Sequence, residues 1–360
     1  MRPMNMPSFY QDELLYGYWA RWYQRSGCSS FKDFYNNVFA KGKRISHELT
    51  NQVQPWVWEK IGPEIICHTL VGYYTRYANN GHAAWRKLSK NRRYTKNMLN
   101  NTWKIEKHLK YCPDCVQKER QQYGECYWHL TCQIPGVCFC PVHGTILNYG
   151  SKKITKKHCE IPVPAELAIP AEVYKGRKWT AREEAFQRYL LHINESPLLW
   201  TGVHPNFVIH RFLPYKYMTT GERSVRYLNL TKDLIAFYRN TAVFPDSIQE
   251  YRQVQNIFSG RSHNVIRIIE IGFYLNIPFT ELANPSMHDR KKRDDALTDR
   301  EKDLWMRIFR KHEGQSYTQI CNSDPENKMR IQMMRKTDPE WTGKHMPERR
   351  RSRKKEKQML

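Results

Sequence analysis

The stretches Cys112-Pro113-Asp114-Cys115 and Cys140-Pro141-Val142-His143 decide how the middle of this 360-residue chain folds. Each stretch carries two soft metal ligands separated by two residues, with proline directly after the first ligand. The 24 residues between the two stretches exceed the loop of about 12–15 residues that is common in zinc fingers. We therefore predict a small independent zinc lobe rather than a minimal finger. Its predicted ligands are Cys112, Cys115, Cys140 and His143.

Neighbouring cysteines and histidines compete for the metal. Cys138 is the main rival of Cys140, but only Cys140 has the two-residue spacing to His143. His129 is a rival of His143, but it stands among aromatic residues, where a packed histidine is ordinary. The other candidates are expected in the core or lack a second pair that would complete another zinc site: Cys126, Cys132 and His158-Cys159. Four protein ligands leave no position for water, so the predicted zinc is structural rather than catalytic.

The composition indicates a polyanion as partner and no membrane. Lysine and arginine number 59 against 35 acidic residues, a net charge of +24. An excess of this size favours nucleic acid. No stretch approaches about 18 consecutive apolar residues, so we expect no transmembrane helix. Residues 1–9 lack the apolar core of a signal peptide, and the ten cysteines are therefore expected as thiols and metal ligands.

The predicted fold is mainly α, with several helical, helix-turn-helix-like domains flanking the zinc lobe. Apolar residues recur at helical spacing over 11–24 and 31–39, and a third helix is predicted over about 64–78. Asp12 and Glu13 are expected in the first turn of the first helix, where acids are favourable. Such short helices fit a helix-turn-helix domain or a generic helical bundle. The predicted domains are an N-terminal helical domain (1–107), the zinc-finger lobe (108–150), a connector (151–205), a helical domain (206–285), a C-terminal helix-turn-helix-like domain (286–345) and a basic disordered tail (346–360).

Two sets of basic residues are candidate DNA contacts. Residues 76–118 hold eleven lysines and arginines against two acids; such side chains neutralise phosphates, although a charge run is also typical of a solvated face. The candidates in this segment are Arg86, Lys87, Arg92 and Arg93. The second set lies on a helix predicted after Ser323 or Asp324, and consists of Lys328, Arg330, Gln332 and Arg335. Glutamine can read adenine and arginine can read guanine.

Three later segments complete the secondary-structure prediction. Thr298-Asp299-Arg300-Glu301 is a capping box that starts a helix, and Gly314 makes a turn before the second basic set. This region fits either a helix-turn-helix or a plain helical hairpin. Residues 231–239 are predicted as a helix, whereas the apolar run 264–275 fits a helix or a strand by periodicity.

The sequence contains no recognisable catalytic constellation. A Gly-rich phosphate loop with Lys-Ser/Thr is absent, and so are the known signatures of serine or cysteine nucleophiles. A zinc-supported nuclease would also need a His/Asn/Asp set that activates a metal, which we cannot assemble from the residues. We therefore expect a binding protein, not an enzyme.

Several short pieces around the two Cys-Pro stretches form one pattern: Tyr111-Cys112-Pro113-Asp114-Cys115, Tyr123-Gly124-Glu125, Tyr127-Trp128-His129, Pro135-Gly136 and Cys140-Pro141-Val142-His143-Gly144. Further pieces are Pro7, Asp12-Glu13-Leu14-Leu15-Tyr16, Ser262-His263-Asn264 and Arg335-Lys336-Thr337-Asp338-Pro339-Glu340-Trp341. Together they resemble the TnsD/TniQ family of transposon target-site selectors. The resemblance is firm over residues 7–150 and loose over 206–341, and it implies that 264–275 is a helix.

The resemblance implies an adaptor of a cut-and-paste transposon. Such a protein binds a target and recruits an AAA+ ATPase regulator (TnsC-like), which brings in the transposase. TnsD-like members read double-stranded target DNA directly, whereas some TniQ-like members dock on a CRISPR effector with its guide RNA. The basic C-terminal helices and tail favour direct DNA contact, and docking on a CRISPR effector is the alternative. The family also implies a location in the bacterial cytoplasm, at the nucleoid.

Overall fold

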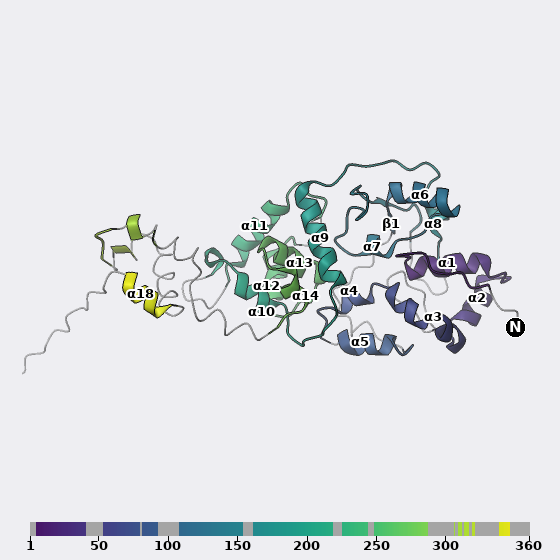
Figure 1. Ribbon diagram of the computed structural model, residues 1–360, viewed down its shortest axis with the longest axis horizontal. Coiled ribbons are helices and arrows are strands. Elements are labelled where there is room, and N and C mark those ends of the chain that lie inside the picture. Colours follow the sequence, from purple (N-terminus) through teal and green to yellow (C-terminus); the bar gives the residue numbers. More distant parts are fainter. Residues whose placement is uncertain are drawn as a thin grey trace, which may run out of the picture. The chain divides into compact units, whose positions relative to one another are not determined.

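The computed structural model is mainly helical (Figure 1), which confirms the predicted fold class. It describes residues 5–40, 53–79, 81–92, 108–153, 161–218, 225–243 and 248–286, and the short pieces 306, 309–311, 313–316, 319–320 and 338–345. The chain divides into two compact units. One consists of Met1–Phe212 with Thr231–Pro285, and the other of Leu213–Leu230 with Ser286–Leu360. The finer domain boundaries stay predictions.

The N-terminal helices of the first unit pack around an aromatic core. These helices are α1 (Leu15–Arg25), α2 (Phe31–Val38), α3 (Pro55–Cys67), α4 (Val71–Thr75) and α5 (Gly81–Leu88). The Ser30 side chain caps α2 by accepting a hydrogen bond from the Asp33 amide, which satisfies an amide that the helix leaves free. The core residues that fill the space between α1, α2 and α3 include Trp19, Trp22, Phe34, Val57 and Ile65. Burying rings of this size is the main source of stability here.

The predicted third helix over 64–78 is wrong in its limits. The chain instead forms α3, which starts at Pro55 and runs through Pro63, and then α4 after a break. Proline at the first helical position is favourable because its fixed φ suits the helix and its missing N–H is not needed there. The break is held by the start of α1, because the Leu15 amide donates to the His68 carbonyl at 2.9 Å.

The acids before α1 also differ from the prediction. Asp12 and Glu13 precede the helix instead of occupying its first turn, and Asp12 has φ +59°. Glu13 forms an antiparallel bridge with His129. The Leu14 amide donates to the Trp128 carbonyl, and the Leu130 amide donates to the Asp12 carbonyl, both at 2.7 Å. The segment before α1 is therefore joined by backbone hydrogen bonds to the predicted zinc lobe.

The predicted zinc lobe is built from a two-stranded antiparallel sheet and two helices. Strands β1 (Lys110–Tyr111) and β2 (Asn148–Tyr149) pair with Lys110 opposite Tyr149. Helices α6 (Pro113–Tyr123) and α7 (Leu130–Gln133) lie between them in sequence. The lobe shares one core with the start of the chain and with α8 (Ala165–Ala168), through residues such as Leu14, Tyr16, Trp128, Ala165 and Ile169. The prediction of an independent lobe is therefore wrong, because its apolar residues are buried jointly with those of its neighbours.

The remaining helices of the first unit are grouped together in Figure 1. They are α9 (Ala181–Glu195), α10 (Asn206–Phe212), α11 (Tyr227–Tyr238), α12 (Tyr251–Phe258), α13 (Val265–Tyr274) and α14 (Phe279–Ala283), of which α11 begins in the second unit. Helix α9 starts with a capping box of Thr180 and Glu183 and packs against α13 and α14. The helix implied over 264–275 is confirmed as α13, and the helix predicted over 231–239 as α11.

The second unit is described in short pieces. They include the 3₁₀ turn Tyr215–Tyr217 and α18 (Pro339–His345), which Asp338 caps by accepting a hydrogen bond from the Trp341 amide at 3.0 Å. The capping box at Thr298 and the helix after Ser323 lie outside the described residues. Among the residues that are described, no helix has the length and apolar content that a bilayer span requires.

Gly136 is expected to be a position that tolerates no side chain. Its φ is +91°, and a Cβ there would collide with Ile266 Cδ1 and lie 2.8 Å from Leu190 Cδ1. We predict that Gly136→Ala lowers the free energy of unfolding by about 2–4 kcal/mol, from backbone strain and overpacking together. Urea unfolding measures this change. Gly27→Ala is the control, since Gly27 has φ +68° but no atom within 4 Å of the added Cβ. If both variants lost the same free energy of unfolding, the contacts of the added Cβ with Ile266 and Leu190 would not explain the effect.

Candidate metal centre

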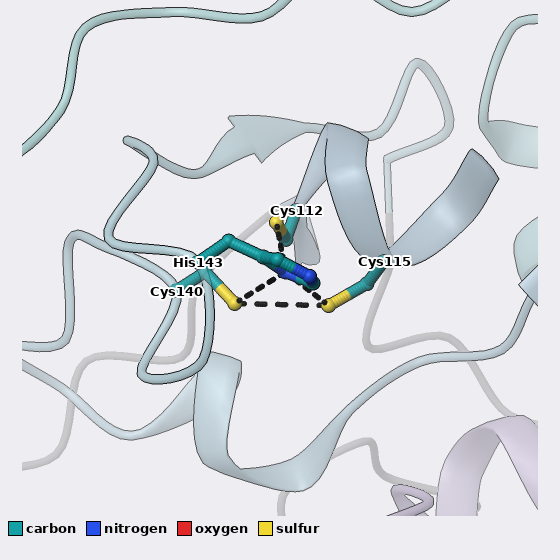
Figure 2. Close-up of side chains that lie close together, drawn as sticks. All are labelled: Cys112, Cys115, Cys140 and His143. Atoms are coloured by element: carbon teal, nitrogen blue, oxygen red, sulfur yellow. Dashed lines mark hydrogen bonds between the residues drawn. The ribbon is translucent and has the colours of Figure 1, made fainter. Parts of the chain in front are cut away.

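The first Cys-Pro stretch is shaped by the start of a helix. Cys112 follows β1 and is the N-cap of α6, and Pro113 occupies the first helical turn. The fixed φ of proline predisposes this turn to be helical. Cys115 is the third residue of α6, and its sulfur lies with that of Cys112 around the imidazole of His143 (Figure 2).

The second stretch is a tight turn that brings His143 back over Cys140. The Gly144 amide donates to the Cys140 carbonyl at 2.8 Å, and the Cys140 amide donates to the Thr145 carbonyl at the same distance. Gly144 has φ +65°, a conformation that glycine adopts without steric cost. The turn therefore sets the spacing between the sulfur of Cys140 and the imidazole of His143.

The structure brings the four predicted ligands together (Figure 2). Their donor atoms all lie within 4.8 Å of one another, and the three cysteines are buried. His143 Nδ1 lies 3.6 Å from Cys112 Sγ, 3.3 Å from Cys115 Sγ and 3.5 Å from Cys140 Sγ. Cys115 Sγ lies 3.6 Å from Cys140 Sγ. A cluster with this composition and spacing can hold a metal ion.

Beside the cluster, Asp114 of the first stretch makes a hydrogen bond and an ion pair with residues that follow the second stretch. The Thr145 hydroxyl donates to Asp114 Oδ2 at 2.6 Å, and Lys175 Nζ lies 2.6 Å from Asp114 Oδ1. The hydrogen bonds from Lys175 and Thr145 lower the pKa of Asp114 below its ordinary value. Asp114 is therefore held as a carboxylate, which fixes the first stretch against the residues that follow the second.

The three thiols do not titrate independently. Hydrogen bonds from Cys112 and Cys115 lower the pKa of Cys140. Hydrogen bonds with Cys112 and Cys140, together with burial, raise the pKa of Cys115. One thiolate is therefore favoured among the three sulfurs, and a bound cation would favour the charged form of the others as well.

The rival ligands have other partners. Cys138 Sγ lies 3.2 Å from the Ala242 carbonyl. His129 lies between Glu119 Oε1 at 2.5 Å and Asp12 Oδ2 at 3.4 Å. Burial lowers the pKa of His129, but the hydrogen bonds with Asp12 and Glu119 outweigh burial and raise it to about 9. His129, Glu119 and Cys115 also lie within 4.8 Å of one another, but an imidazolium in an ion pair is a poor ligand. Cys126 and Cys132 are buried.

Only part of the predicted DNA-contact set lies in the described residues. Arg86 and Lys87 lie in the last turn of α5. Arg86 and Arg92 are exposed and Lys87 is half-buried. The predicted contacts outside the described residues are Arg93, Lys328, Arg330, Gln332 and Arg335.

The structure shows site residues that the sequence argument did not assign. Asp114 and Thr145 connect the two stretches, and Asp114 could have been suspected because it lies inside the first stretch. Glu13 pairs with Arg21 in the interior, with 2.6 Å between Glu13 Oε2 and Arg21 Nη2. This pair could have been suspected from the sequence, because Arg21 is the single arginine among the buried apolar residues of the first helix.

Comparison with known proteins supports the family that the residues suggested. Residues 5–147 match the TniQ family. The chain is also 35% identical, over 46 residues, to the transposon Tn7 transposition protein TnsD of Escherichia coli. That match covers 13% of this chain and 9% of the relative, so it spans only a small part of either protein. The similarity to the TniQ family therefore lies in residues 5–147, the part of the chain that contains both Cys-Pro stretches.

Proposed function

We propose that Cys112, Cys115, Cys140 and His143 bind one structural Zn²⁺. Zinc takes sulfur at about 2.3 Å and nitrogen at about 2.0–2.1 Å, which puts the edges of a tetrahedron at roughly 3.5–3.8 Å. The separations of His143 Nδ1 from the three sulfurs and of Cys115 Sγ from Cys140 Sγ, 3.3–3.6 Å, are close to this length. With four protein ligands, the ion would stabilise the lobe and leave no position for a reacting water.

We propose that the protein is a target-site selector of a cut-and-paste transposon and has no catalytic activity. The TniQ match over residues 5–147, which includes both Cys-Pro stretches, carries this proposal. The function would consist of binding double-stranded target DNA and recruiting an AAA+ ATPase regulator. The net charge of +24 supports a nucleic-acid partner.

The proposed DNA contacts begin at the exposed end of α5. Arg86 and Arg92 present two guanidinium groups to solvent, with Lys87 beside them. We predict that the logarithm of the DNA-binding constant falls linearly with the logarithm of the salt concentration. Replacing both Arg86 and Arg92 by alanine is predicted to reduce the slope of that line by about 2, since each lost phosphate contact removes about 1. Fluorescence anisotropy with a labelled duplex measures the slope.

The control for this prediction is Lys60→Ala. Lys60 is an exposed cation on α3 outside the proposed contact set, so its loss is predicted to leave the slope unchanged. An equal change in both variants would indicate a general charge effect and would contradict the assignment of Arg86 and Arg92.

Sequence selectivity tests the selector function itself. We expect the purified protein to prefer a particular chromosomal duplex over a scrambled duplex of equal length. Binding without preference at every salt concentration would contradict direct reading of DNA. In that case the alternative of docking on a CRISPR effector is tested by co-expression, in which the protein would be recovered with the guide RNA and Cas proteins.

A further inference from the structure

A cavity of about 160 Å³ lies in the first unit, away from the metal centre. It is formed by the residues after α4, by the start of α5, by the loop 198–204 and by the residues at the end of α14. The lining residues that matter below are Arg76, Asn79, His82, Trp200, His204 and His263. None of them is among the proposed zinc ligands or DNA contacts.

Arg76 places a buried positive charge at this cavity. Arg76 is a buried residue, with 8% of its surface exposed. Nη1 donates to the Ala283 carbonyl at 3.1 Å, and Nη2 donates to the carbonyls of Asn194 at 3.0 Å and Ser196 at 2.6 Å. Nε is buried and makes no hydrogen bond within the described part of the chain. Burial lowers the pKa of Arg76 below its ordinary value, with a smaller opposing effect of Tyr77.

This charge has no acidic counterpart within the described ranges, where no carboxylate oxygen lies within 4.0 Å of the guanidinium. Backbone carbonyls satisfy hydrogen bonds but do not neutralise a charge, and an uncompensated buried cation is costly. An anion that entered the cavity would therefore gain a desolvated, preorganised guanidinium as its partner.

The two histidines at the cavity do not add to this charge at neutral pH. Burial lowers the pKa of both imidazoles, and for His204 the neighbouring His263 lowers it further. The two rings lie 4.5 Å apart and edge to face. His263 Nδ1 lies 2.7 Å from the Tyr77 carbonyl, so the histidines form a fixed neutral wall.

An aromatic and apolar side of the cavity is held in place by the loop 198–204. Trp200 has φ +42°, which is strained for a residue other than glycine. The loop keeps this conformation because the Leu199 amide donates to Asn284 Oδ1 at 3.3 Å and the Thr201 hydroxyl donates to the Pro285 carbonyl at 2.5 Å. The Trp200 ring lies 5.4 Å from His82, and its Nε1 is a second buried donor without a partner in the described residues. Leu199 is 63% exposed.

We propose that this cavity is a docking site for one acidic side chain of a partner protein, an aspartate or glutamate next to an apolar residue. The volume favours this class, because sites for drug-sized or nucleotide-sized ligands span about 300–1,000 Å³. The guanidinium of Arg76 binds the carboxylate, and the exposed Leu199 contacts the neighbouring apolar residue. This site is separate from the proposed DNA contacts. If the peptide did not bind, the proposal of DNA binding would therefore be unaffected.

The test uses the full-length protein labelled with 5-fluorotryptophan. The Trp200→Phe variant assigns the Trp200 resonance among the eleven tryptophans. N-acetyl-leucyl-aspartyl amide is the probe, and its asparagine analogue is the matched neutral control. We expect the aspartyl peptide to shift the Trp200 resonance in a saturable way and the asparaginyl peptide to bind roughly tenfold more weakly, since a hydrogen bond to a charged group is the stronger one.

Variants at an exposed lining residue test the site without altering the buried Arg76. Asn79 lines the cavity and is exposed. Asn79→Asp places a competing carboxylate at the site and is expected to weaken the aspartyl peptide roughly tenfold, whereas Asn79→Ser is expected to bind as the unchanged protein does. No shift with the aspartyl peptide would overturn the proposal. A shift caused by inorganic phosphate or duplex DNA in its place would also overturn it and would assign the cavity to nucleic acid.

Discussion

A Cys112→Ser variant is expected to lose its zinc and to unfold the lobe that contains both Cys-Pro stretches. The apparent free energy of zinc binding at structural sites is about 10–16 kcal/mol, which equals or exceeds the whole stability of about 5–15 kcal/mol of an ordinary domain. Three ligands would remain, but the buried sulfurs of Cys115 and Cys140 would lie beside a hydroxyl in place of a thiolate. Zinc content by mass spectrometry, circular dichroism and limited proteolysis measure the loss.

Two other cysteines serve as controls for this variant. Cys67 is exposed on α3, so Cys67→Ser is expected to keep one zinc per chain and to change stability by no more than about 0.5 kcal/mol. Cys138→Ser tests the rival ligand directly, and zinc retention is expected there too, because Cys138 Sγ contacts the Ala242 carbonyl. A folded Cys112→Ser protein without zinc would show that the metal is not needed for the fold.

The loss of the lobe is expected to reach the N-terminal helices. The Leu14 amide and the Leu130 amide are bonded across the junction between the two regions, and Leu14 and Tyr16 share a core with Trp128. A bound zinc ion is therefore expected to stabilise a larger part of the first unit than the residues between its ligands. In the proposed selector, recruitment of the ATPase would fail together with zinc binding.

Local sequence patterns predicted those features of the structure that depend on residues close together in sequence. The two-residue spacing of Cys112 with Cys115 and of Cys140 with His143 named the four side chains that the structure brings together. The apolar periodicity over 11–24 and 31–39 identified α1 and α2. In these cases the residues that determine the element are a few positions apart, so spacing alone carries the information.

Contacts between distant segments could not be read in the same way. Asp12 and Glu13 were predicted in the first turn of a helix. The backbone of Glu13 instead forms a β-bridge with His129, which is more than a hundred residues away in sequence. The limits of the third helix were wrong for a related reason: the break before α4 is stabilised by Leu15 of another helix. Nothing in the local sequence of either segment encodes its partner, because tertiary contacts override local preference.

The second large effect is expected at the buried ion pair of Glu13 and Arg21. Arg21 Nε lies 3.0 Å from Glu13 Oε1, and Nη2 lies 2.6 Å from Oε2, so the two planar groups make a bidentate contact. Both residues are buried, and the guanidinium also lies 4.1 Å above the centre of the Tyr10 ring. Removing one partner of such a pair leaves a buried charge and typically costs about 3–5 kcal/mol.

Arg21→Met is therefore expected to lower the free energy of unfolding by about 3–5 kcal/mol at pH 7. The effect should depend on pH, because burial raises the pKa of Glu13 and Arg21 lowers it. In the variant only the Tyr10 amide and His68 still oppose the effect of burial on the pKa of Glu13. The folded state therefore binds a proton at a pH where the unfolded carboxyl, with a pKa of about 4.3, does not. The free energy of unfolding of the variant therefore rises as the pH falls from 7 toward 5. Its difference from that of the unchanged protein should become smaller over this range. Urea unfolding at both pH values measures this difference.

The Glu13→Gln variant distinguishes the contribution of the carboxylate from that of the guanidinium. It leaves Arg21 with the Ser8 carbonyl at 2.7 Å and with Glu125 Oε1 at 4.0 Å, so we expect a smaller loss than for Arg21→Met and no narrowing of that loss at low pH. In the double variant neither buried charge remains, and the cost should fall below the sum of the single costs by about 1–3 kcal/mol. Additive single costs would show that each residue stabilises the fold through its own packing. In that case the carboxylate and the guanidinium would not be coupled, and the bidentate contact would not account for the effect.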